Sequence, residues 1–240
     1  MNTSAADRQI AINAYTEQAQ TLREIALIKQ SRSWKVSSPY RWFARKLRGE
    51  ATRPELSRYE GKDLSSSYYQ NLHDTLEAYQ QNNWLIDRID DALRCEPESI
   101  LEIGCGNGRF SKAVASRVAS VVASDWAKSP MLTDLPANVQ FAQKDIVNDS
   151  LPSCDLVCSA DVLEHFHPTD INNVIEKLHQ AGRYNYHVIA CYDDNHSHLT
   201  IISPGQWLSL FYRLSAGYRI KSIEPRRNDP AQLICVIANF

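Results

Sequence analysis

Short apolar runs rich in β-branched residues alternate with helical periodicities along residues 65–240. Such alternation is typical of parallel strands joined by right-handed helical crossovers, so it predicts an α/β sheet covered by helices. The expected strands lie at 99–104, 118–125, 139–144, 156–161 and 186–191, and the expected helices at 68–82, 84–94, 109–117 and 170–180.

Two further strands, 218–224 and 232–239, are expected near the end of the sequence. The turn-like sequence PRRNDP joins them, and so short a connection favours an antiparallel hairpin at the edge of the sheet. The sheet is therefore expected to be mostly parallel, with one reversed strand pair.

A glycine turn follows the first expected strand, in the sequence SILEIGCGNGRF. The dinucleotide fingerprint requires a third glycine where this chain has Arg109, and a P-loop requires Gly-Lys-Ser/Thr after its glycines. Spacing therefore excludes both phosphate motifs. Two interpretations stay open: a turn that lets a ligand approach the backbone, or a tight strand-to-helix turn with no ligand. Glu102, an acid at the end of an apolar strand, is costly to bury without a role.

Acidic residues also follow the next expected strands. Asp125 ends the second strand, and a carboxylate there can accept hydrogen bonds from both hydroxyls of a ribose. Asp145 and the apolar Ile146 follow the third strand and suit the amine and the ring of an adenine. The fourth strand ends in Asp161. Open α/β sheets bind ligands at the carboxyl ends of their strands, so we expect these positions to share one site.

Taken in order, LEIGCGNG, SDWA, QKDIVN and DLVCSADVLEHF resemble the class I S-adenosylmethionine-dependent methyltransferases over roughly residues 65–240. The resemblance implies a Rossmann-like three-layer α/β sandwich with a seven-stranded, mostly parallel sheet and an antiparallel C-terminal hairpin, here with an N-terminal helical extension. It also implies S-adenosylmethionine as the cofactor. The cofactor-binding residues that it implies are Glu102, Gly104, Cys105, Gly106, Asn107, Gly108, Asp125, Trp126, Asp145, Ile146, Ala160 and Asp161.

A hydroxyl that accepts a methyl group must lose its proton, and a general base with a pKa near neutrality assists this step. The candidate bases are His165, His167, His196 and His198, and the candidate orienting partners are Asp161 and Asp193. His165 is the first choice as the catalytic base, with Asp161 as its partner, because it directly follows the fourth strand. The alternative is that His165 only packs at the start of the next helix. No ligand spacing among histidine, cysteine and acidic residues indicates a metal site, so no metal is expected.

Four side chains are expected to contact the acceptor. Tyr68 and His73 precede the first strand, where this class of enzyme often places a lid helix. His196 and His198 lie in the polar loop CYDDNHSH after the fifth strand. The helical spacing of the first pair is equally consistent with plain packing.

The first 64 residues have a different character. Residues 7–30 lack proline and glycine and place apolar residues at helical spacing, which fits a helix that pairs with another copy or partner, or lies on the main domain. The segment Arg32 to Arg48 interleaves basic and aromatic residues, which suits an anionic partner or a connector that packs on the main domain. The anionic partner is a membrane surface, a phosphorylated glycan or, least favoured, a nucleic acid. We therefore expect two domains: 1–64, with this helix and basic-aromatic segment, and 65–240, the methyltransferase domain.

SRSWKVSSPYRWFARKLR also resembles a short segment of bacterial glycosyltransferases and associated enzymes of surface-polysaccharide assembly. HSHLTIISPGQWLSLF resembles the segment after the fifth strand in methyltransferases of such gene contexts. These resemblances imply O-methylation of a sugar in a bacterial cell-surface glycan or glycolipid, with lipopolysaccharide and its O-antigen as candidates. The alternatives are a small-molecule or protein acceptor, and a non-catalytic scaffold in a glycan assembly complex.

Composition limits the kinds of binding partner and the cellular location that we expect. The 240 residues include 26 basic and 28 acidic ones, a net charge of −2, so nucleic acid is not an expected partner. None of the 6 cysteines forms a CxxC pair, and we interpret them as reduced thiols. The sequence shows neither a signal peptide nor an apolar run of membrane-spanning length. A cytoplasmic protein is expected, with the inner face of the membrane as the alternative location.

Overall fold

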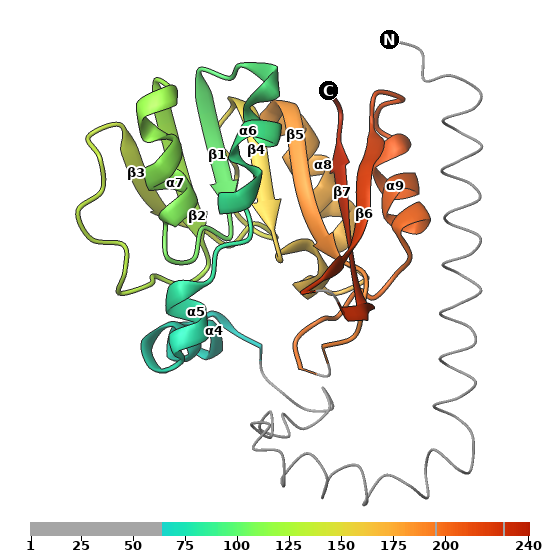
Figure 1. Ribbon diagram of the computed structural model, residues 1–240, viewed down its shortest axis with the longest axis horizontal. Helices are drawn as coiled ribbons and strands as arrows, with labels where there is room; N and C mark the ends of the chain where they lie inside the picture. The colour runs from blue at the N-terminus through green and yellow to red at the C-terminus, as the bar shows by residue number, and fades with distance from the viewer. Residues whose placement is uncertain (1–63, 195, 228) are drawn as a thin grey trace, which may run out of the picture. The chain divides into compact units, whose positions relative to one another are not determined.

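The computed structural model describes residues 64–194, 196–227 and 229–240. A seven-stranded sheet with the strand order β3-β2-β1-β4-β5-β7-β6 forms its centre (Figure 1). The pairs from β3 to β5 are parallel, and β7 runs antiparallel to both β5 and β6. The expected mostly parallel sheet with a reversed hairpin is thus confirmed. The strands are β1 (Ser99–Ile103), β2 (Ser120–Asp125), β3 (Val139–Gln143), β4 (Cys154–Ala160), β5 (Gly182–Ala190), β6 (Arg219–Arg226) and β7 (Asp229–Ala238).

Helices cover both faces of the sheet and make the three layers (Figure 1). On one face, α6 and α7 pack on a core that includes Ile100 and Phe110. On the other face, α8 and α9 pack on a core that includes Leu101 and Trp207. Successive strand residues point to opposite faces, so Ile100 and Leu101 of β1 serve different cores. The helices on the faces are α6 (Ile89–Ala92), flanked by the 3-10 helices η1 (Ile86–Arg88) and η2 (Leu93–Cys95), α7 (Arg109–Val114), extended by η3 (Ala115–Arg117), α8 (Ile171–Ala181) and α9 (Pro204–Tyr212).

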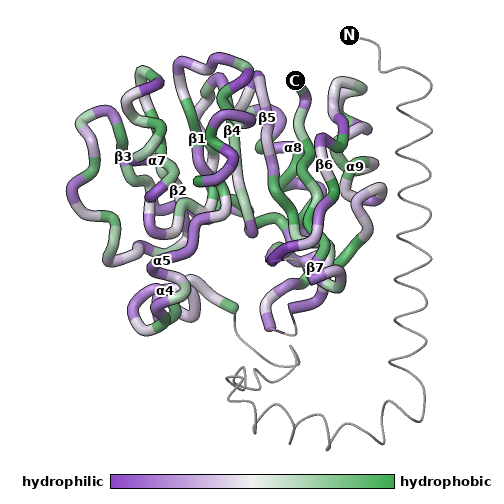
Figure 2. Tube along the Cα trace, in the orientation of Figure 1, coloured by the Kyte–Doolittle hydropathy of each residue, from purple (hydrophilic) through white to green (hydrophobic). Residues whose placement is uncertain are grey.

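Helix α8 illustrates how the sequence pattern produces the packing. Its buried residues recur at a spacing of three or four, which forms one apolar stripe against the sheet. They are Ile171, Val174, Ile175, Leu178 and Ala181. Figure 2 shows the same sorting in the sheet, with hydrophobic residues along the second half of β7 and hydrophilic ones at the turn between β6 and β7.

Several element boundaries differ from the expected ones. The helix expected at 68–82 is two helices, α4 (Ser66–Thr75) and α5 (Glu77–Gln81), because Leu76 is extended at φ −108° and ψ 109°. The Gln80 side chain stabilises the break by donating to the carbonyl of His73 at 2.8 Å. The stretch expected as a helix at 84–94 is a series of short turns around α6.

The second half of the chain contains one helix that was not expected. Helix α9 begins with a capping box, in which Ser203 accepts from the backbone N–H of Gln206 and the Gln206 side chain accepts from that of Ser203. Pro204 at the first helical position fits the same start signal. Strand β5 begins at Gly182, directly after α8 and four residues earlier than expected.

The predictions for residues 1–63, including the N-terminal helix and the basic-aromatic segment, lie outside the described residues. The boundary between two domains near residue 64 stays a prediction. Within the part of the chain that the structure describes, no helix is long and apolar enough to span a membrane.

Candidate functional site

The glycine turn connects β1 to α7, and all three of its glycines adopt the left-handed conformation: φ is 67° at Gly104, 53° at Gly106 and 71° at Gly108. A Cβ at Gly104 would lie 2.3 Å from Val162 Cγ2, and one at Gly108 would lie 2.6 Å from Leu132 Cδ2. At Gly106, by contrast, nothing lies within 4 Å of that position. Two glycines therefore serve close packing, while Gly106 leaves open space beside the backbone, where a ligand can approach.

Asp125, the last residue of β2, holds this turn in place. Its carboxylate accepts from the backbone N–H of Gly106 at 2.8 Å and from that of Ala127 at 3.1 Å. A carboxylate offers about four acceptor sites, so both oxygens keep capacity for hydroxyl donors of a ligand. Burial raises the pKa of Asp125, and the backbone N–H groups oppose that rise. The residue thus links the turn to the position where the ribose contact is expected.

Glu102 lies beneath the turn and is 1% exposed. Its carboxyl group accepts from Ser111 Oγ of α7 and, at 3.4 Å, from Asn83 Nδ2. Burial raises its pKa to about 8, against the hydrogen bonds from Ser111 and Asn83. The acid is therefore mostly protonated at neutral pH and ties β1 to α7 and to the segment before α6.

Two other residues of the turn have structural partners. Cys105 is fully buried, and its backbone N–H donates to the carbonyl of Ser124 at 3.0 Å. Asn107 is 2% exposed and donates from Nδ2 to the carbonyls of Gln80 and Asn82, both at 3.0 Å. Through Asn107 the turn contacts the end of α5.

The two residues expected to hold an adenine have different surroundings: the Asp145 side chain belongs to a turn, and the Ile146 side chain to the core. Asp145 accepts from the backbone N–H of Val147 at 3.0 Å and from Asn148 Nδ2 at 2.8 Å, as part of the turn after β3. Ile146 is 7% exposed and belongs to the same core cluster as Leu101. Core packing accounts for its side chain, and the adenine contact stays a prediction.

Helix α4 lies across the carboxyl ends of the strands, below β1 and β2 in Figure 1. Tyr69 Oη lies 3.4 Å from His165 Nδ1, and the Tyr69 ring is 6.1 Å from that of Trp126, between ring centroids. Gln70 exchanges two hydrogen bonds with the backbone of Lys128, at 2.8 and 2.9 Å. Tyr68 Oη contacts the His196 ring in the loop after β5. The helix therefore joins three ends of the sheet, as a lid would.

His73 and Trp126 differ in exposure. His73 is 4% exposed, packs edge-on against the Tyr79 ring at 5.5 Å between centroids, and has no hydrogen-bond partner for Nδ1 among the described residues. Trp126 directly follows Asp125 and is 38% exposed. Plain packing explains His73, whereas the exposed indole is accessible to a ligand.

Asp161 follows Ala160, the last residue of β4, and adopts a left-handed conformation at φ 58°. Its carboxylate accepts from Arg226 Nη2, and Arg226 also donates to Tyr192 Oη at 2.8 Å. The Arg226 guanidinium stacks over the Trp84 ring, 4.2 Å from its centroid. Arg226 thus engages the Asp161 carboxylate, and the role of Asp161 as an orienting partner of His165 stays a prediction.

Sequence reasoning missed Arg226, although a signal existed. Strand β6 runs antiparallel to β7, which runs antiparallel to β5, so β6 points the same way as the parallel strands. Arg226 is the last residue of β6 and therefore lies at the same edge as the other strand ends. Applying the rule of carboxyl strand ends to the C-terminal hairpin would have identified it.

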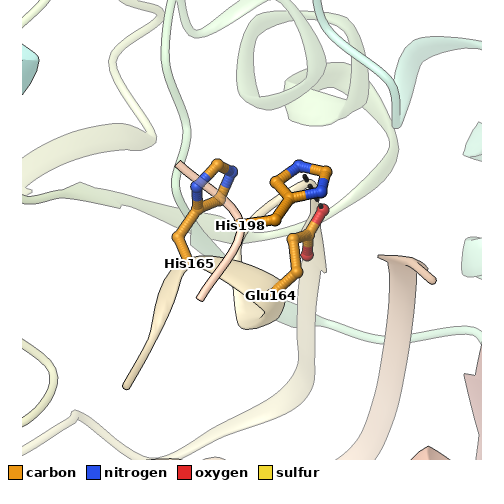
Figure 3. A group of neighbouring side chains, drawn as sticks. All are labelled: Glu164, His165 and His198. Atoms are coloured by element: carbon orange, nitrogen blue, oxygen red, sulfur yellow. Dashed lines mark ion pairs between the residues drawn. The ribbon is translucent and has the colours of Figure 1, made fainter. Parts of the chain in front are cut away.

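Beyond Asp161, the 3-10 helix η4 (Leu163–His165) brings two side chains towards His198 (Figure 3). Burial raises the pKa of Glu164 well above its usual range, and the nearby Asp161 carboxylate adds to this. Burial, with a smaller contribution from His198, lowers the pKa of His165 to about 4. His165 is thus neutral at physiological pH and a weak general base. His167, by contrast, is exposed, with Nδ1 2.8 Å from Thr169 Oγ1.

Comparison with known proteins accounts for this arrangement of strand ends. Residues 100–184 match a family described as "Methyltransferase domain". This part of the chain is thus similar to a methyltransferase domain. The matched residues include the glycine turn, α7 and Asp125 at the end of β2.

The chain has curated relatives at low identity. One is the ubiquinone biosynthesis O-methyltransferase of Pseudomonas putida, 25% identical over 122 residues, which are 47% of this chain and 52% of the relative. The same enzyme of Pseudomonas syringae pv. tomato is 25% identical over 137 residues, 53% of this chain and 57% of the relative. The chain thus spans about half the length of these curated relatives.

Solved structures share the fold. The 1,6-didemethyltoxoflavin-N1-methyltransferase of Burkholderia thailandensis, solved with its substrate and S-adenosylhomocysteine, has a TM-score of 0.58 and 14% identity, over 72% of this chain and 84% of its own. The magnesium protoporphyrin IX methyltransferase of Synechocystis, solved with S-adenosylhomocysteine, has a TM-score of 0.52 and 12% identity, over 72% and 98%. The fold is therefore what these proteins share with this chain, while the acceptors that they are named for differ.

Proposed function

We propose that the protein is an S-adenosylmethionine-dependent methyltransferase that transfers the methyl group to a hydroxyl. The open backbone position at Gly106, held by the Asp125 carboxylate at 2.8 Å, carries this proposal. It offers the close approach and the acceptor group that a nucleoside bearing a charged methionine tail requires. The match of residues 100–184 to a methyltransferase domain supports it.

The chain's own residues bind and orient the reactants. Asp125 would accept from the ribose hydroxyls, and Glu102 would support the turn that faces the methionine portion. Once bound, S-adenosylmethionine supplies a methyl group on a positively charged sulfur. The acceptor oxygen loses its proton and bonds to the methyl carbon as the carbon–sulfur bond breaks, which yields an ether, S-adenosylhomocysteine and one proton. Alignment in a site that excludes water supplies much of the rate enhancement.

The acceptor that we propose is a sugar hydroxyl of a bacterial cell-surface glycan or glycolipid. The similarity of SRSWKVSSPYRWFARKLR and HSHLTIISPGQWLSLF to segments of surface-polysaccharide enzymes supports it. In this proposal Tyr68 and His196, which contact each other across the site, and His198 would border the acceptor. The N-terminal helix would recruit another copy or a partner, and Arg32 to Arg48 would contact an anionic membrane surface at its cytoplasmic face.

A second candidate acceptor is a phenolic hydroxyl. One specific observation favours it, because the curated relatives are ubiquinone biosynthesis O-methyltransferases. A phenol loses its proton more readily than a sugar hydroxyl does, so a weak base such as His165 would serve it better.

Calorimetry with S-adenosylhomocysteine tests the cofactor half of the proposal. We expect binding by the full-length chain, and a loss of about 10- to 100-fold in affinity for Asp125→Ala, since a hydrogen bond to a charged group contributes roughly 1.5–3 kcal/mol. The matched control is Asp90→Ala on α6, whose exposed carboxylate pairs with Arg117. No binding at high micromolar ligand would contradict the enzyme and favour the scaffold, and an Asp125→Ala variant that binds as tightly as the parent refutes the ribose contact.

Incubation with methyl-labelled S-adenosylmethionine tests the acceptor. Cell-envelope glycan extracts and simple catechols are offered in parallel, and the labelled product is analysed after mild acid hydrolysis. Label in a sugar methyl ether supports the glycan acceptor, and label in the catechol alone supports the phenolic one.

A further inference from the structure

Three side chains that can bind a metal converge beside the strand ends: Glu164, His165 and His198, here called the Glu-His-His cluster (Figure 3). Each offers one ligand atom, and these atoms lie within 4.8 Å of one another. Glu164 and His165 come from η4, whereas His198 comes from the loop after β5. Backbone hydrogen bonds hold that loop on η4: the N–H groups of Leu199 and Thr200 donate to the carbonyl oxygen of Glu164 at 2.8 and 3.0 Å.

Backbone carbonyls orient both histidine rings. His165 Nδ1 lies 3.1 Å from the carbonyl oxygen of Ser197, and His198 Nδ1 lies 2.6 Å from that of Tyr192. A carbonyl oxygen only accepts, so the proton of each neutral ring is on Nδ1 and the lone pair is on Nε2. Metal-binding histidines typically have such an outer partner on the other ring nitrogen.

The Glu164 carboxylate is fully buried and incompletely paired. Oε1 accepts from the backbone N–H of Ala190 at 3.2 Å. Oε2 has no hydrogen-bond partner among the described residues, and the side chain is 0% exposed. A buried polar atom without a partner is costly unless a ligand satisfies it.

No direct hydrogen bond closes the cluster. His198 Nε2 lies 3.9 Å from Glu164 Oε1 and 3.8 Å from Asp194 Oδ2, which is beyond hydrogen-bond range. Other groups already engage the neighbouring carboxylates: Asp161 pairs with Arg226, and Asp194 accepts from the backbone N–H groups of His196, Ser197 and His198. The ligand atoms of the three side chains are therefore not joined to one another by hydrogen bonds.

We propose that the Glu-His-His cluster binds a divalent transition-metal ion of the Zn²⁺ class. Two imidazoles and one carboxylate suit such an ion, whereas Mg²⁺ prefers oxygen ligands throughout. Tetrahedral Zn²⁺, with bonds of about 2.0–2.2 Å, holds its ligands roughly 3.5 Å apart, so side-chain rotations suffice to close the triangle. Three protein ligands leave one coordination position open for another molecule.

The use of this site rests on the proposed function. Tyr69 contacts His165 and the ring of Trp126, so the cluster lies at the strand edge that bears Asp125. An ion there would contact the acceptor hydroxyl and lower the pKa of that hydroxyl. The hydroxyl proton would pass to solvent before the methyl group is transferred.

Titration of the untagged, chelator-treated full-length chain with Zn²⁺ alone tests the site. We expect one ion per chain by calorimetry. For Glu164→Gln and for His198→Ala we expect the affinity to fall at least about 10- to 100-fold, because removal of a residue that only hydrogen-bonds to a metal ligand already has an effect of that size. His179→Gln is the matched control, because His179 lies on α8 outside the cluster, with its Nδ1 3.0 Å from Tyr218 Oη. Equal affinity in parent, Glu164→Gln and His198→Ala overturns the proposal.

If a variant unfolds, the visible absorption spectrum of the parent chain loaded with Co²⁺ in place of Zn²⁺ still tests the site. We expect the visible bands of a low-coordinate site with nitrogen and oxygen ligands. Cys191 and Cys235 are a competing site, since their sulfur atoms lie 3.5 Å apart. A thiolate-to-cobalt charge-transfer band, or stoichiometric Mg²⁺ binding that His198→Ala leaves intact, would contradict the Glu-His-His site.

The Zn²⁺ titration tests the metal site separately from the methyltransferase proposal, because it is done without the cofactor. Binding of S-adenosylhomocysteine without binding of Zn²⁺ would refute the metal site and leave the methyltransferase proposal standing. Binding of Zn²⁺ without binding of S-adenosylhomocysteine would support the metal site and refute the methyltransferase proposal.

Discussion

Arg226, the last residue of β6, forms an ion pair with Asp161, the residue that follows β4. The two side chains are 6% and 20% exposed, so the pair is largely shielded from water. It links the C-terminal hairpin to the centre of the sheet and fixes Asp161 beside Glu164.

Replacement of Arg226 by glutamine should therefore destabilise the protein. Removing one partner of a buried ion pair leaves the other charge uncompensated, and we expect a loss of about 3 kcal/mol in the free energy of unfolding, measured with urea. Arg227→Gln is the control, because Arg227 is exposed and only stacks on the same Trp84 ring, 4.9 Å from its centroid. The double variant Asp161→Asn with Arg226→Gln should recover part of the loss, and equal effects at 226 and 227 would count against the pair.

Alanine at Gly106 should mainly weaken ligand binding, whereas alanine at Gly104 should mainly reduce stability. Gly106→Ala adds a Cβ to open space and costs about 1–2 kcal/mol for the left-handed conformation, but it should weaken S-adenosylhomocysteine binding at least about tenfold. Gly104→Ala forces its Cβ against Val162 and should lose about 1–3 kcal/mol more stability. Thermal unfolding and calorimetry distinguish the two. A Gly106→Ala protein with parental affinity would show that the ligand lies elsewhere.

Glu102 should make stability depend on pH. Its pKa is about 8 in the folded protein and 4.5 in the unfolded chain, so the folded state retains the proton longer. The unfolded state binds fewer protons between these values, and the parent should lose stability as the pH rises from about 5 to 8. Glu102→Gln lacks this ionisation and should become more stable relative to the parent over that window. Urea unfolding at both ends of the window measures it, and a pH-independent difference contradicts a buried, neutral Glu102.

The same acid should release a proton when the cofactor binds. The ammonium group of S-adenosylhomocysteine favours ionised Glu102 if it contacts that residue, which lowers the pKa. Calorimetry at pH 7 in phosphate and in Tris buffer should then give different binding enthalpies for the parent and similar ones for Glu102→Gln. Identical parental enthalpies in both buffers would mean that the ammonium group does not meet this acid.

Gln70 should control the opening of α4. Its two hydrogen bonds to the Lys128 backbone attach the helix to the end of β2. In Gln70→Ala we expect faster amide hydrogen exchange in α4, and unchanged exchange in β1, because only local opening is affected. Asn71→Ala, an exposed neighbour on the same helix, is the control. Equal exchange in the two variants would place the attachment of the helix elsewhere.

Local patterns predicted the sheet and the glycine turn well. The strands alternate or run apolar over five to ten residues, and the turn requires glycine at three positive-φ positions. Asp125 was predictable for the same reason, because it ends a strand directly beside that turn. Such features depend on neighbouring residues, so the order of residue types is sufficient.

The contacts across the site were not predictable in this way. Glu164 and His198 meet only because a loop after β5 folds back onto η4, and the metal-ligand spacing in the sequence shows nothing of this. Arg226 reaches Asp161 from the last hairpin. The break between α4 and α5 depends on the Gln80 side chain, which competes with the backbone of a continuous helix. Each of these depends on tertiary contacts between distant residues.

The backbone and the side chain of Glu164 have different roles. Its carbonyl oxygen anchors the loop that carries His198, while its carboxylate faces the two histidines. Anchorage therefore does not depend on which side chain stands at position 164. A single substitution there can alter reactivity while the architecture around it is inherited unchanged, so descendants of this fold can diverge in chemistry without first having to rebuild a loop.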